Sequence, residues 1–370
     1  MNEIKKKQFY KGLRATTEFL LAKKKHLCDF KFDKPIKIKL VAIAKNESAY
    51  LPEWIFHHLY FGFDQIDVHV NRTTDNTLKV LNKVAQLPNV SIKNADKFFS
   101  TYKGNPQSGL YKKVLKETKG SEFTHVCFLD IDEFWTPMDL KSTIHDCVKS
   151  SGKFDVISFE WINKVEPNNT FGPALSENIT YQRAPQLKSI IDVRCPVIRA
   201  NPHTLVNPYL IYKNGNGEKI VHDNTSFSRV PRSDLQKPVK PYFILHRFYR
   251  SEFEYIAILG RGRPNFPEQG NSKIKSNRNG YADIERVETF EFDPNALGQY
   301  REFINEYYEK YIESKEFEAA REYIRQGYSR VLSIVRNSEK AEMATIKKAF
   351  ANVRDAKALT AYNQFLDKVN

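Results

Sequence analysis

The sequence predicts an α/β fold built on a mainly parallel sheet with helices on its faces. Short apolar runs alternate with segments of helical periodicity, and a polar cluster follows each run. Strands of a parallel sheet are buried on both faces, so they are expected to be short and continuously apolar. Because right-handed crossovers join such strands, the polar clusters should gather along one edge of the sheet.

The first elements can be placed in chain order. The apolar runs that predict strands are residues 39–44, 66–70, 90–92 and 126–129. The helices expected between them are residues 51–62, 77–87 and 107–118. Pro52 supports the start of the first helix, because proline is favoured in a first helical turn. On the second helix, the apolar spacing predicts one buried face made of Leu78, Leu81, Val84 and Ala85.

Residues 124–135, THVCFLDIDEFW, carry the most informative pattern in the chain. The buried strand should deliver Asp130 and Asp132 to the edge where ligands bind in open α/β sheets. Two crowded carboxylates repel each other unless a cation or donors offset their charge, and Mg²⁺ or Mn²⁺ prefers such oxygen ligands. The alternative is a solvated turn in which neither aspartate has a ligand.

Several further motifs occur in a fixed order along the chain. They are KNE at 45–47, LPEWIFHHLYFGFDQI, NRTTDNT at 71–77, FLDIDEF, Trp161 with Phe171 and Gly172, Lys188-Ser189-Ile190, His203, HRFYRSEFE and RGR at 261–263. In these motifs, residues 38–265 resemble bacterial glycosyltransferases related to families 2 and 92, which have the GT-A fold. The resemblance is closer in the first half than in the second.

The resemblance implies roles for individual residues. The residues expected to bind the donor are Lys45, Asn46, Glu47, Asn71, Asp75 and Asp130. Glu47 and Asp75 should face the nucleoside, whereas Asn46 and Asn71 should order their loops. The implied ligands of a divalent cation are Asp130, Asp132 and His246, with Asp132 the more direct ligand. The chain departs from the family pattern at Arg72 and in the longer segment 163–170.

The chemistry of sugar transfer explains these residue types. Charge grows on the leaving diphosphate, and a bridging metal ion stabilises that charge without moving protons. Arg261 and Arg263 offer forked donors for phosphate, although they could equally form a solvated basic loop. His246 could instead be a hydrogen-bonded structural residue, since imidazole suits Mg²⁺ less well than oxygen does.

An inverting transfer also needs a base for the acceptor hydroxyl, ordinarily an aspartate or glutamate. Our choice from the sequence is Asp192, in the matched KSIIDVR stretch. Glu160, Glu166 and Asp223 remain alternatives, because most acidic residues in such a region form ion pairs or lie on the surface.

The chain has 370 residues and a net charge of +14. Residues 1–39 hold 12 basic and 4 acidic side chains, a net of +8, and their apolar spacing predicts a basic amphipathic helix. Such a helix would suit a peripheral position on an anionic membrane, and a solvated helix is the alternative. The four scattered cysteines and the lack of a signal peptide predict a cytoplasmic protein with reduced thiols.

The expected organisation has four parts. Residues 1–37 form the basic flank, 38–265 the catalytic domain, 266–291 a mobile loop and 292–370 a helical extension. Within the catalytic domain, residues 38–136 are assigned to the donor half and 137–265 to the acceptor half. The extension could cover the acceptor cleft, mediate a homodimer, or both.

The sequence therefore predicts a metal-dependent, inverting hexosyltransferase that uses a nucleotide sugar such as UDP-galactose or UDP-glucose. Its expected acceptor is a glycan or glycolipid of bacterial lipopolysaccharide or capsule synthesis. A nucleotidyltransferase acting on a sugar phosphate is the closer alternative, although KNESAYLPEW lacks the glycine-rich basic loop expected of that class. A nucleic-acid-binding protein is disfavoured because no groove-reading or RNA-binding motif is present.

Overall fold

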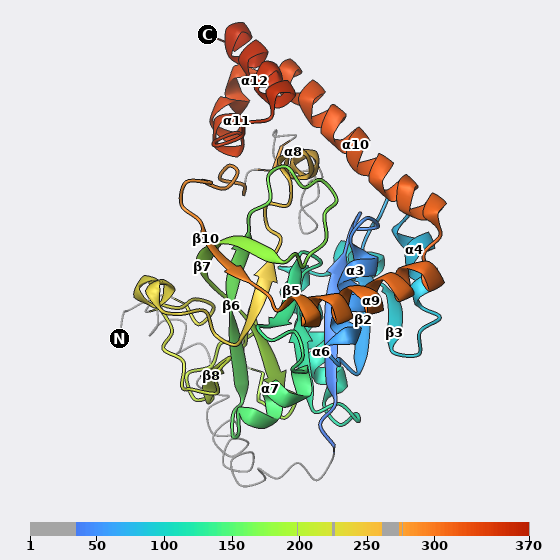
Figure 1. Ribbon diagram of the computed structural model, residues 1–370, viewed down its shortest axis with the longest axis vertical. Helices are drawn as coiled ribbons and strands as arrows, with labels where there is room; N and C mark the ends of the chain where they lie inside the picture. Colours follow the sequence, from blue (N-terminus) through green and yellow to red (C-terminus); the bar gives the residue numbers. More distant parts are fainter. Residues whose placement is uncertain (1–34, 198, 224–225, 261–273, 276, 370) are drawn as a thin grey trace.

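A computed structural model describes residues 35–260, 274, 275 and 277–369, apart from residues 198, 224 and 225. Its centre is a curled ten-stranded mixed sheet, flanked by helices (Figure 1). Four parallel strands form one half in the order β3-β2-β1-β4. Their bounds are Ile38–Ala44 for β1, Gln65–Val70 for β2, Val90–Asn94 for β3 and His125–Phe128 for β4. The four strands expected from the apolar runs are therefore confirmed.

Three helices between these strands were expected, and they are α3 (Leu51–Tyr60), α4 (Thr77–Val84) and α6 (Pro106–Thr118). A fourth, short helix, α5 (Asp96–Thr101), was not predicted. Asn105 caps α6, because its side chain accepts a hydrogen bond from the backbone N–H of Ser108. One expectation is wrong: Leu78 is 48% exposed, and the buried face of α4 consists of Thr77, Val80, Leu81 and Val84.

The second half of the sheet adds antiparallel pairs, so the sheet is mixed, although most strand pairs are parallel as expected. Beyond β4 the order continues β7-β6-β9-β5, and β7 runs antiparallel to β4. The bounds are Glu133–Pro137 for β5, Val156–Lys164 for β6, Asn178–Asp192 for β7 and Tyr242–His246 for β9. Two short strands complete the sheet, β8 (Tyr212–Asn214) on β6 and β10 (Glu288–Glu291) on β7. Helix α7 (Ile144–Ser150) connects β5 with β6.

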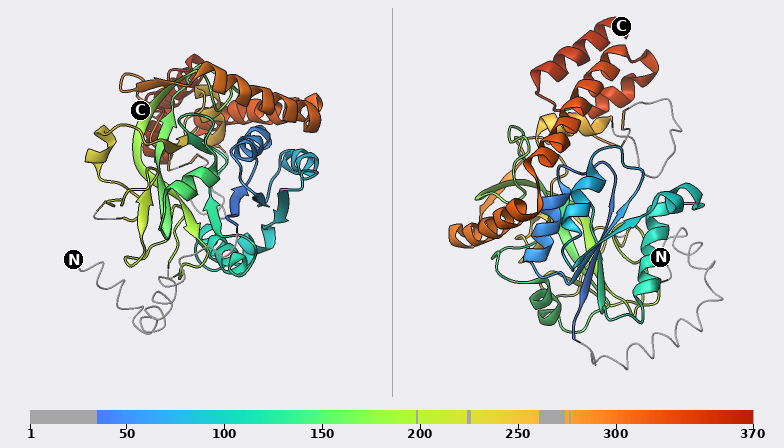
Figure 2. Two further views of the ribbon diagram at one scale, coloured as in Figure 1. Left: turned by 60° about the horizontal axis from the view of Figure 1, so that its bottom comes forward. Right: turned by 90° about the vertical axis from the view of Figure 1, so that its right-hand side faces the viewer.

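The C-terminal region is helical, as expected. It contains α9 (Pro294–Tyr311), α10 (Ser314–Asn337), α11 (Met343–Ala349) and α12 (Ala356–Val369). Helix α9 lies against α3, and α10 crosses α8 (Glu252–Leu259) (Figures 1 and 2). These two C-terminal helices therefore lie close to the loops that follow the strands in the first half of the chain. Gly327 of α10 faces Ala257 of α8, where an added Cβ would make an ordinary van der Waals contact of 3.4 Å with the carbonyl oxygen.

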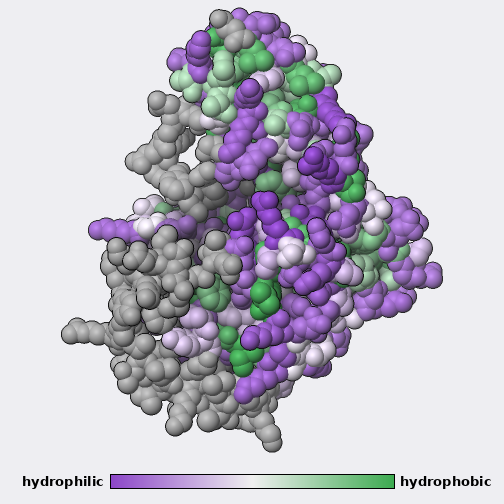
Figure 3. Space-filling view, turned by 90° about the vertical axis from the view of Figure 1, so that its left-hand side faces the viewer, coloured by the Kyte–Doolittle hydropathy of each residue, from purple (hydrophilic) through white to green (hydrophobic). Residues whose placement is uncertain are grey.

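Apolar side chains fill both faces of the sheet. The larger cluster includes the buried indoles of Trp54 and Trp135 and extends to the C-terminal helices, while the smaller one lies under α6 and the loops after β7. Cys127, Cys147 and Cys195 are buried free thiols, as expected. On the face shown in Figure 3, hydrophobic residues are interspersed with hydrophilic ones.

Several expectations fall on residues outside this description. Residues 1–34, which hold most of the basic flank, and residues 261–273, which include Arg261 and Arg263, are outside it. No helix within the described ranges is both long and apolar enough to cross a membrane.

Candidate functional site

The acidic motif lies where β4 ends and the chain turns into β5. Asp130 and Asp132 occupy this turn, and Glu133 begins β5 beside His246 of β9. A backbone hydrogen bond of 2.7 Å from the N–H of Arg247 to the carbonyl of Asp132 ties the turn to the end of β9. The three carboxylates therefore project from a backbone held by hydrogen bonds on both sides.

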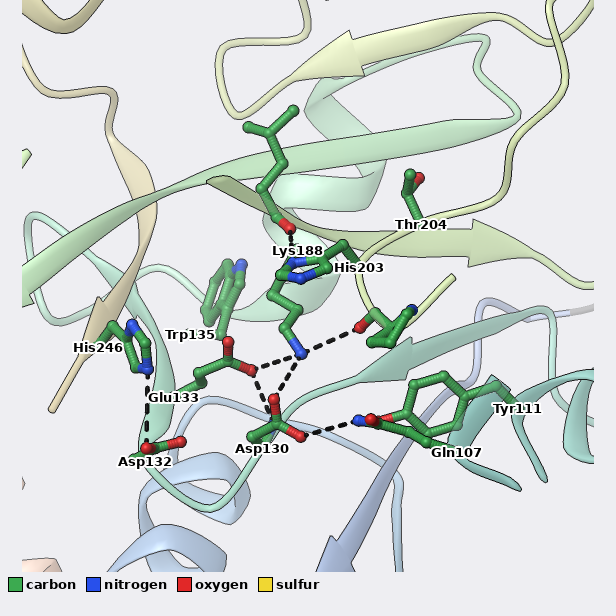
Figure 4. A network of polar contacts seen from close by, with 12 residues as sticks. Gln107, Tyr111, Asp130, Asp132, Glu133, Trp135, Lys188, His203, Thr204 and His246 are labelled. Carbon is green, nitrogen blue, oxygen red and sulfur yellow. Dashed lines mark hydrogen bonds and ion pairs between the residues drawn. The ribbon is translucent and has the colours of Figure 1, made fainter. Parts of the chain in front are cut away.

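A buried ion cluster fixes two of these carboxylates. The ammonium group of Lys188, on β7, lies 3.0 Å from a carboxylate oxygen of Asp130 and 2.9 Å from one of Glu133 (Figure 4). It also donates to the carbonyl oxygen of Pro202 at 3.1 Å. Lys188 and Glu133 are fully buried, whereas the side chain of Asp130 is 40% exposed. The other oxygen of Asp130 accepts from Nε2 of Gln107 at 3.4 Å, so the carboxylate is held on two sides while part of it stays exposed.

The charges of this cluster depend on one another. Burial raises the pKa of Glu133 well above its usual range, although the Lys188 ammonium opposes that shift. For Lys188, burial would lower the pKa, but Asp130 and Glu133 raise it well above its ordinary value. Lys188 is therefore a permanent positive charge between two acids, and removing it would leave Glu133 buried without its cation.

Asp132 points away from this cluster and faces His246. Its carboxylate oxygen lies 3.7 Å from Nε2 of His246 (Figure 4). Nδ1 of His246 lies 3.0 Å from the side-chain oxygen of Asn163, which only accepts, so Nδ1 carries the proton in the neutral ring. The lone pair of Nε2 then faces a carboxylate, an arrangement that a proton or a metal cation stabilises.

Arginines add positive charge around Asp132. Burial by itself would raise the pKa of Asp132, but a hydrogen bond from His246 when its Nε2 is protonated, together with the charges of Arg250 and Arg278, holds it below its ordinary value. Arg250 is buried, has a left-handed backbone at φ 55°, and stacks its guanidinium 3.5 Å from the ring centre of Tyr50. Arg278 stacks on Phe248 at 3.9 Å. Both guanidinium groups thus add positive charge to the surroundings of Asp132.

The side chains present are compatible with a divalent cation. Asp132 offers oxygen and His246 offers nitrogen, with Asn163 orienting the imidazole from behind. No group of three or more His, Cys, Asp or Glu ligands occurs in the described part of the chain. Mg²⁺ and related ions commonly take only one or two protein ligands and complete their shell with water and substrate phosphate. Asp130, which the sequence also assigned to the metal, is instead paired with Lys188.

The loops after β1 and β2 are tied together by polar side chains. Asn46, at φ 55°, accepts from the backbone N–H of Thr74 at 2.6 Å and donates to the hydroxyl of Tyr323 at 2.7 Å. Asp75 accepts from the hydroxyl and backbone N–H of Ser48 at 2.6 and 3.1 Å, and from the backbone N–H of Thr77 at 3.0 Å. Both residues therefore hold loop structure, which the sequence predicted for Asn46 but not for Asp75.

The remaining predicted donor residues lie around these loops. Lys45 and Asn46 line a cavity of about 180 Å³, together with Thr74 and with Tyr323 and Arg330 of α10. Glu47 is buried and lies 3.5 Å from Arg250. Asn71 is fully buried, and its side-chain oxygen accepts from Nε of Arg72 at 3.1 Å. Arg72 thus helps to order the loop in which it departs from the family pattern.

The strand directions place Asp192 away from the acidic turn, which argues against our choice of this residue as the base. Asp192 pairs with His125, at the amino end of β4, whereas Asp130 follows its carboxyl end. Its carboxylate is buried and bound by Arg194 at 2.6 Å. Two of the alternatives are also ion-paired, Glu160 with Arg183 and Glu166 with Lys164 and Arg247.

Sequence reasoning missed four side chains that shape the site. They are Lys188, Arg250, Arg278 and Tyr323. Lys188 and Arg250 lie inside motifs that carry the family resemblance. These motifs could therefore have pointed to both residues. Nothing local marks Arg278 or Tyr323, because they reach the site only through the fold.

Comparison with known proteins agrees with the sequence motifs. Residues 42–192 match the model of glycosyltransferase family 92, and this segment contains the strand-end loops, the acidic motif and Lys188. The chain is thus related to that family, and the prediction of a glycosyltransferase is confirmed. No curated protein matches the sequence.

Solved structures give only distant similarities. The structure of S. aureus TarS 1–349 is 13% identical, with a TM-score of 0.32 over 90% of this chain and 91% of that one. The same protein in complex with UDP gives 13% identity and a TM-score of 0.29 over the same shares. In another TarS structure, at 19% identity and a TM-score of 0.29, the match spans 43% of this chain and 28% of that chain. HddC from Yersinia pseudotuberculosis, at 9% identity and a TM-score of 0.29, matches over 49% of this chain and 89% of its own.

Proposed function

We propose, from the relationship to glycosyltransferase family 92, that this protein transfers a hexose from a nucleotide sugar to a glycan or glycolipid acceptor with the help of Mn²⁺ or Mg²⁺. The donor we favour is UDP-galactose or UDP-glucose, and the pathway is lipopolysaccharide or capsule synthesis. The observation that supports the proposal is the pair of Asp132 and His246, which can offer a carboxylate oxygen and the Nε2 lone pair to a cation.

The acidic turn would hold the donor diphosphate. A divalent cation bound to Asp132 and His246 would neutralise charge on the leaving diphosphate. Arg250 and Arg278 add fixed positive charge beside Asp132, and Arg250 is locked by its stacking on Tyr50. Because these groups are already oriented, little reorganisation is needed as negative charge develops.

Asp130 would contact the donor beside the metal position. Its backbone N–H is held by the Glu133 carboxylate at 2.7 Å, and its side chain is held by Lys188. With one oxygen engaged by the ammonium group, the exposed part of the carboxylate can accept hydrogen bonds from the ribose hydroxyls. Lys188 therefore acts as a positioning residue for Asp130.

The stereochemical outcome we propose is inversion at the anomeric carbon. Inversion requires one displacement by the acceptor hydroxyl and a base that takes its proton. Retention would require a second nucleophilic group or a different transition state on the same face of the sugar. The anomeric configuration of the product, measured by proton NMR, distinguishes the two outcomes.

The first experiment is thermal unfolding against a panel of nucleoside diphosphates and nucleotide sugars, with and without Mn²⁺. A ligand that binds only the folded state raises the unfolding midpoint. We expect UDP and one UDP-sugar to raise it in the presence of Mn²⁺, and Asp132→Ala to remove this shift and turnover while the protein stays folded. Asp367→Asn, an exposed acid of α12, is the matched control and should behave as wild type.

Two results would count against the proposal. Full Mn²⁺-dependent turnover by Asp132→Ala would exclude the proposed metal site. Release of pyrophosphate from a nucleoside triphosphate and a sugar phosphate, without sugar transfer, would identify a nucleotidyltransferase instead.

A further inference from the structure

A second cavity lies beside the acidic turn and takes no part in the reaction described above. It has a volume of about 380 Å³, within the range of small-molecule sites. Its walls come from five parts of the chain: the start of α3, the loop at 171–173 after β6, the residue after β9, and helices α9 and α10. The side chains that matter are Tyr50, Glu53, Phe171, Arg247, Tyr308 and Phe317.

This cavity adjoins the reaction site through two residues. Tyr50 lines it and also stacks on Arg250, which lies beside Asp132. Arg247 lines it as well, and its backbone N–H donates to the carbonyl of Asp132 at 2.7 Å. The cavity therefore lies one side-chain layer from the acidic turn, at the same edge of the sheet.

Aromatic rings provide most of the contact surface. Tyr50 is buried, while Phe171, Tyr308 and Phe317 are half-buried. Arg321 of α10 places its guanidinium 4.1 Å from the ring centre of Phe317 and 5.2 Å from that of Phe171, which fixes these rings relative to each other. Rigid, partly exposed aromatic surfaces suit the apolar C–H face of a pyranose ring.

Buried charged groups add directional contacts to the cavity. The guanidinium of Arg247 lies 3.5 Å from the carboxylate of Glu53 and 2.8 Å from that of Glu166, which in turn binds Lys164 at 2.8 Å. Two acids and two bases thus pair with one another within this wall, and Arg321 beside the rings adds a further positive charge. The paired groups supply donors and acceptors that suit a polar ligand rich in hydroxyl groups.

We propose that this cavity binds one neutral hexopyranose unit of the acceptor glycan, with the sugar face on the aromatic rings and its hydroxyls on Glu53 and Arg247. The inference deepens the proposed transferase function and rests on it, because it assigns the second substrate to a place beside the donor. It also gives the C-terminal helices a role in acceptor recognition.

The test is saturation-transfer NMR with neutral disaccharides, for which lactose, cellobiose and maltose are the probes, in the absence of nucleotide. We expect the full-length protein to bind at least one of them. Phe317→Ala removes a ring, and Asn305→Trp fills the cavity from its exposed rim without disturbing buried contacts. Each should weaken disaccharide binding by about tenfold or more, since tenfold corresponds to about 1.4 kcal/mol.

The controls separate this site from the donor site. Tyr209→Ala removes an exposed ring elsewhere and should bind the disaccharide as wild type does. Neither cavity variant should change Mn²⁺-dependent protection by UDP or hydrolysis of the donor by water. Disaccharide binding that persists in both variants, its absence from the wild type, or displacement by inorganic phosphate would overturn the inference. A loss of UDP binding alone would instead overturn the proposed function and leave the sugar site standing.

Discussion

The hydroxyl of Tyr323 lies 2.7 Å from the side-chain nitrogen of Asn46, which donates to it. These residues are 277 positions apart, so the contact joins α10 to the loop after the first strand. Tyr323 also lies 3.2 Å from the hydroxyl of Thr74 in the loop after β2. One phenol from the C-terminal region thus holds both strand-end loops that we assign to the donor.

Removing this hydroxyl should weaken donor binding without unfolding the protein. Tyr323→Phe deletes two hydrogen bonds, each worth about 0.5–1.5 kcal/mol, so we expect the donor KM to rise by about fivefold or more. Initial-rate kinetics with varied nucleotide sugar would measure the change. Tyr362→Phe, on α12, is the matched control, and equal kinetics for both variants would contradict the assignment.

The buried cluster around Lys188 should be sensitive to the loss of its cation. Lys188→Met leaves Glu133 buried without its ammonium partner, and breaking such a pair costs about 3–5 kcal/mol of unfolding free energy. Adding Glu133→Gln should recover part of that loss, because it removes the unpaired charge. Urea unfolding measures both variants.

The exposed pair of Lys237 and Asp234 provides the comparison for this result. Lys237→Met should leave the unfolding free energy close to that of the wild type, since exposed ion pairs contribute little. A loss for Lys188→Met as small as that for Lys237→Met would show that Lys188 is not required to balance Glu133.

Buried histidine should make the fold sensitive to mild acid. Burial lowers the pKa of His57 to about 3, and its ring is held by the carbonyl of Trp135 at 2.9 Å and the hydroxyl of Tyr300 at 3.1 Å. The unfolded chain binds a proton near pH 6.5 and the folded chain does not. The stabilisation is therefore complete above pH 6.5 and falls as the pH drops toward 3.

The variant His57→Gln isolates this contribution. As the pH drops from 6 to 5, the unfolding free energy of this variant should fall less steeply than that of the wild type. The two slopes should differ by about 1.4 kcal/mol per pH unit, the value for one proton. Urea unfolding at a series of pH values gives both slopes. Parallel slopes for the two proteins would mean that His57 does not stay neutral in the folded state.

Two glycines should respond in opposite directions to alanine. Gly298 lies inside α9 with nothing within 4 Å of an added Cβ, so Gly298→Ala should stabilise the protein by about 0.5–1 kcal/mol. Gly280 has φ 98°, and an added Cβ would lie 2.4 Å from the carbonyl oxygen of Ala351. Gly280→Ala should therefore lower the unfolding midpoint, which differential scanning calorimetry would detect.

Local pattern accounts for the parallel half of the sheet. The apolar runs that became β1, β2 and β4 are continuous, and each ends in polar residues, so their positions follow from burial alone. The site was less predictable, because strand direction decides which end of a strand reaches it. β7 runs antiparallel to β4, so Lys188 lies at the edge with Asp130, while Asp192 lies at the opposite edge.

Contacts between distant parts of the chain explain why the roles of Asp75 and Tyr323 were not predicted from the sequence. Asp75 was expected to face the nucleoside, but its oxygens are taken by Ser48 and Thr77, which only the packed loops bring within reach. The helical periodicity of α10 predicts a buried stripe but does not say which loops Tyr323 contacts.

The cavity beside Asn46 is bounded by residues as far apart as Lys45 and Arg330. A growing polypeptide that has left the ribosome up to β9 already contains the strands around Asp130 and Asp132, yet it lacks the residues of α8 and α10 that line this cavity. Synthesis of α10 completes the lining. A nascent chain would therefore acquire its acidic turn well before this cavity could close, and activity that depends on the cavity would begin only when translation is nearly finished.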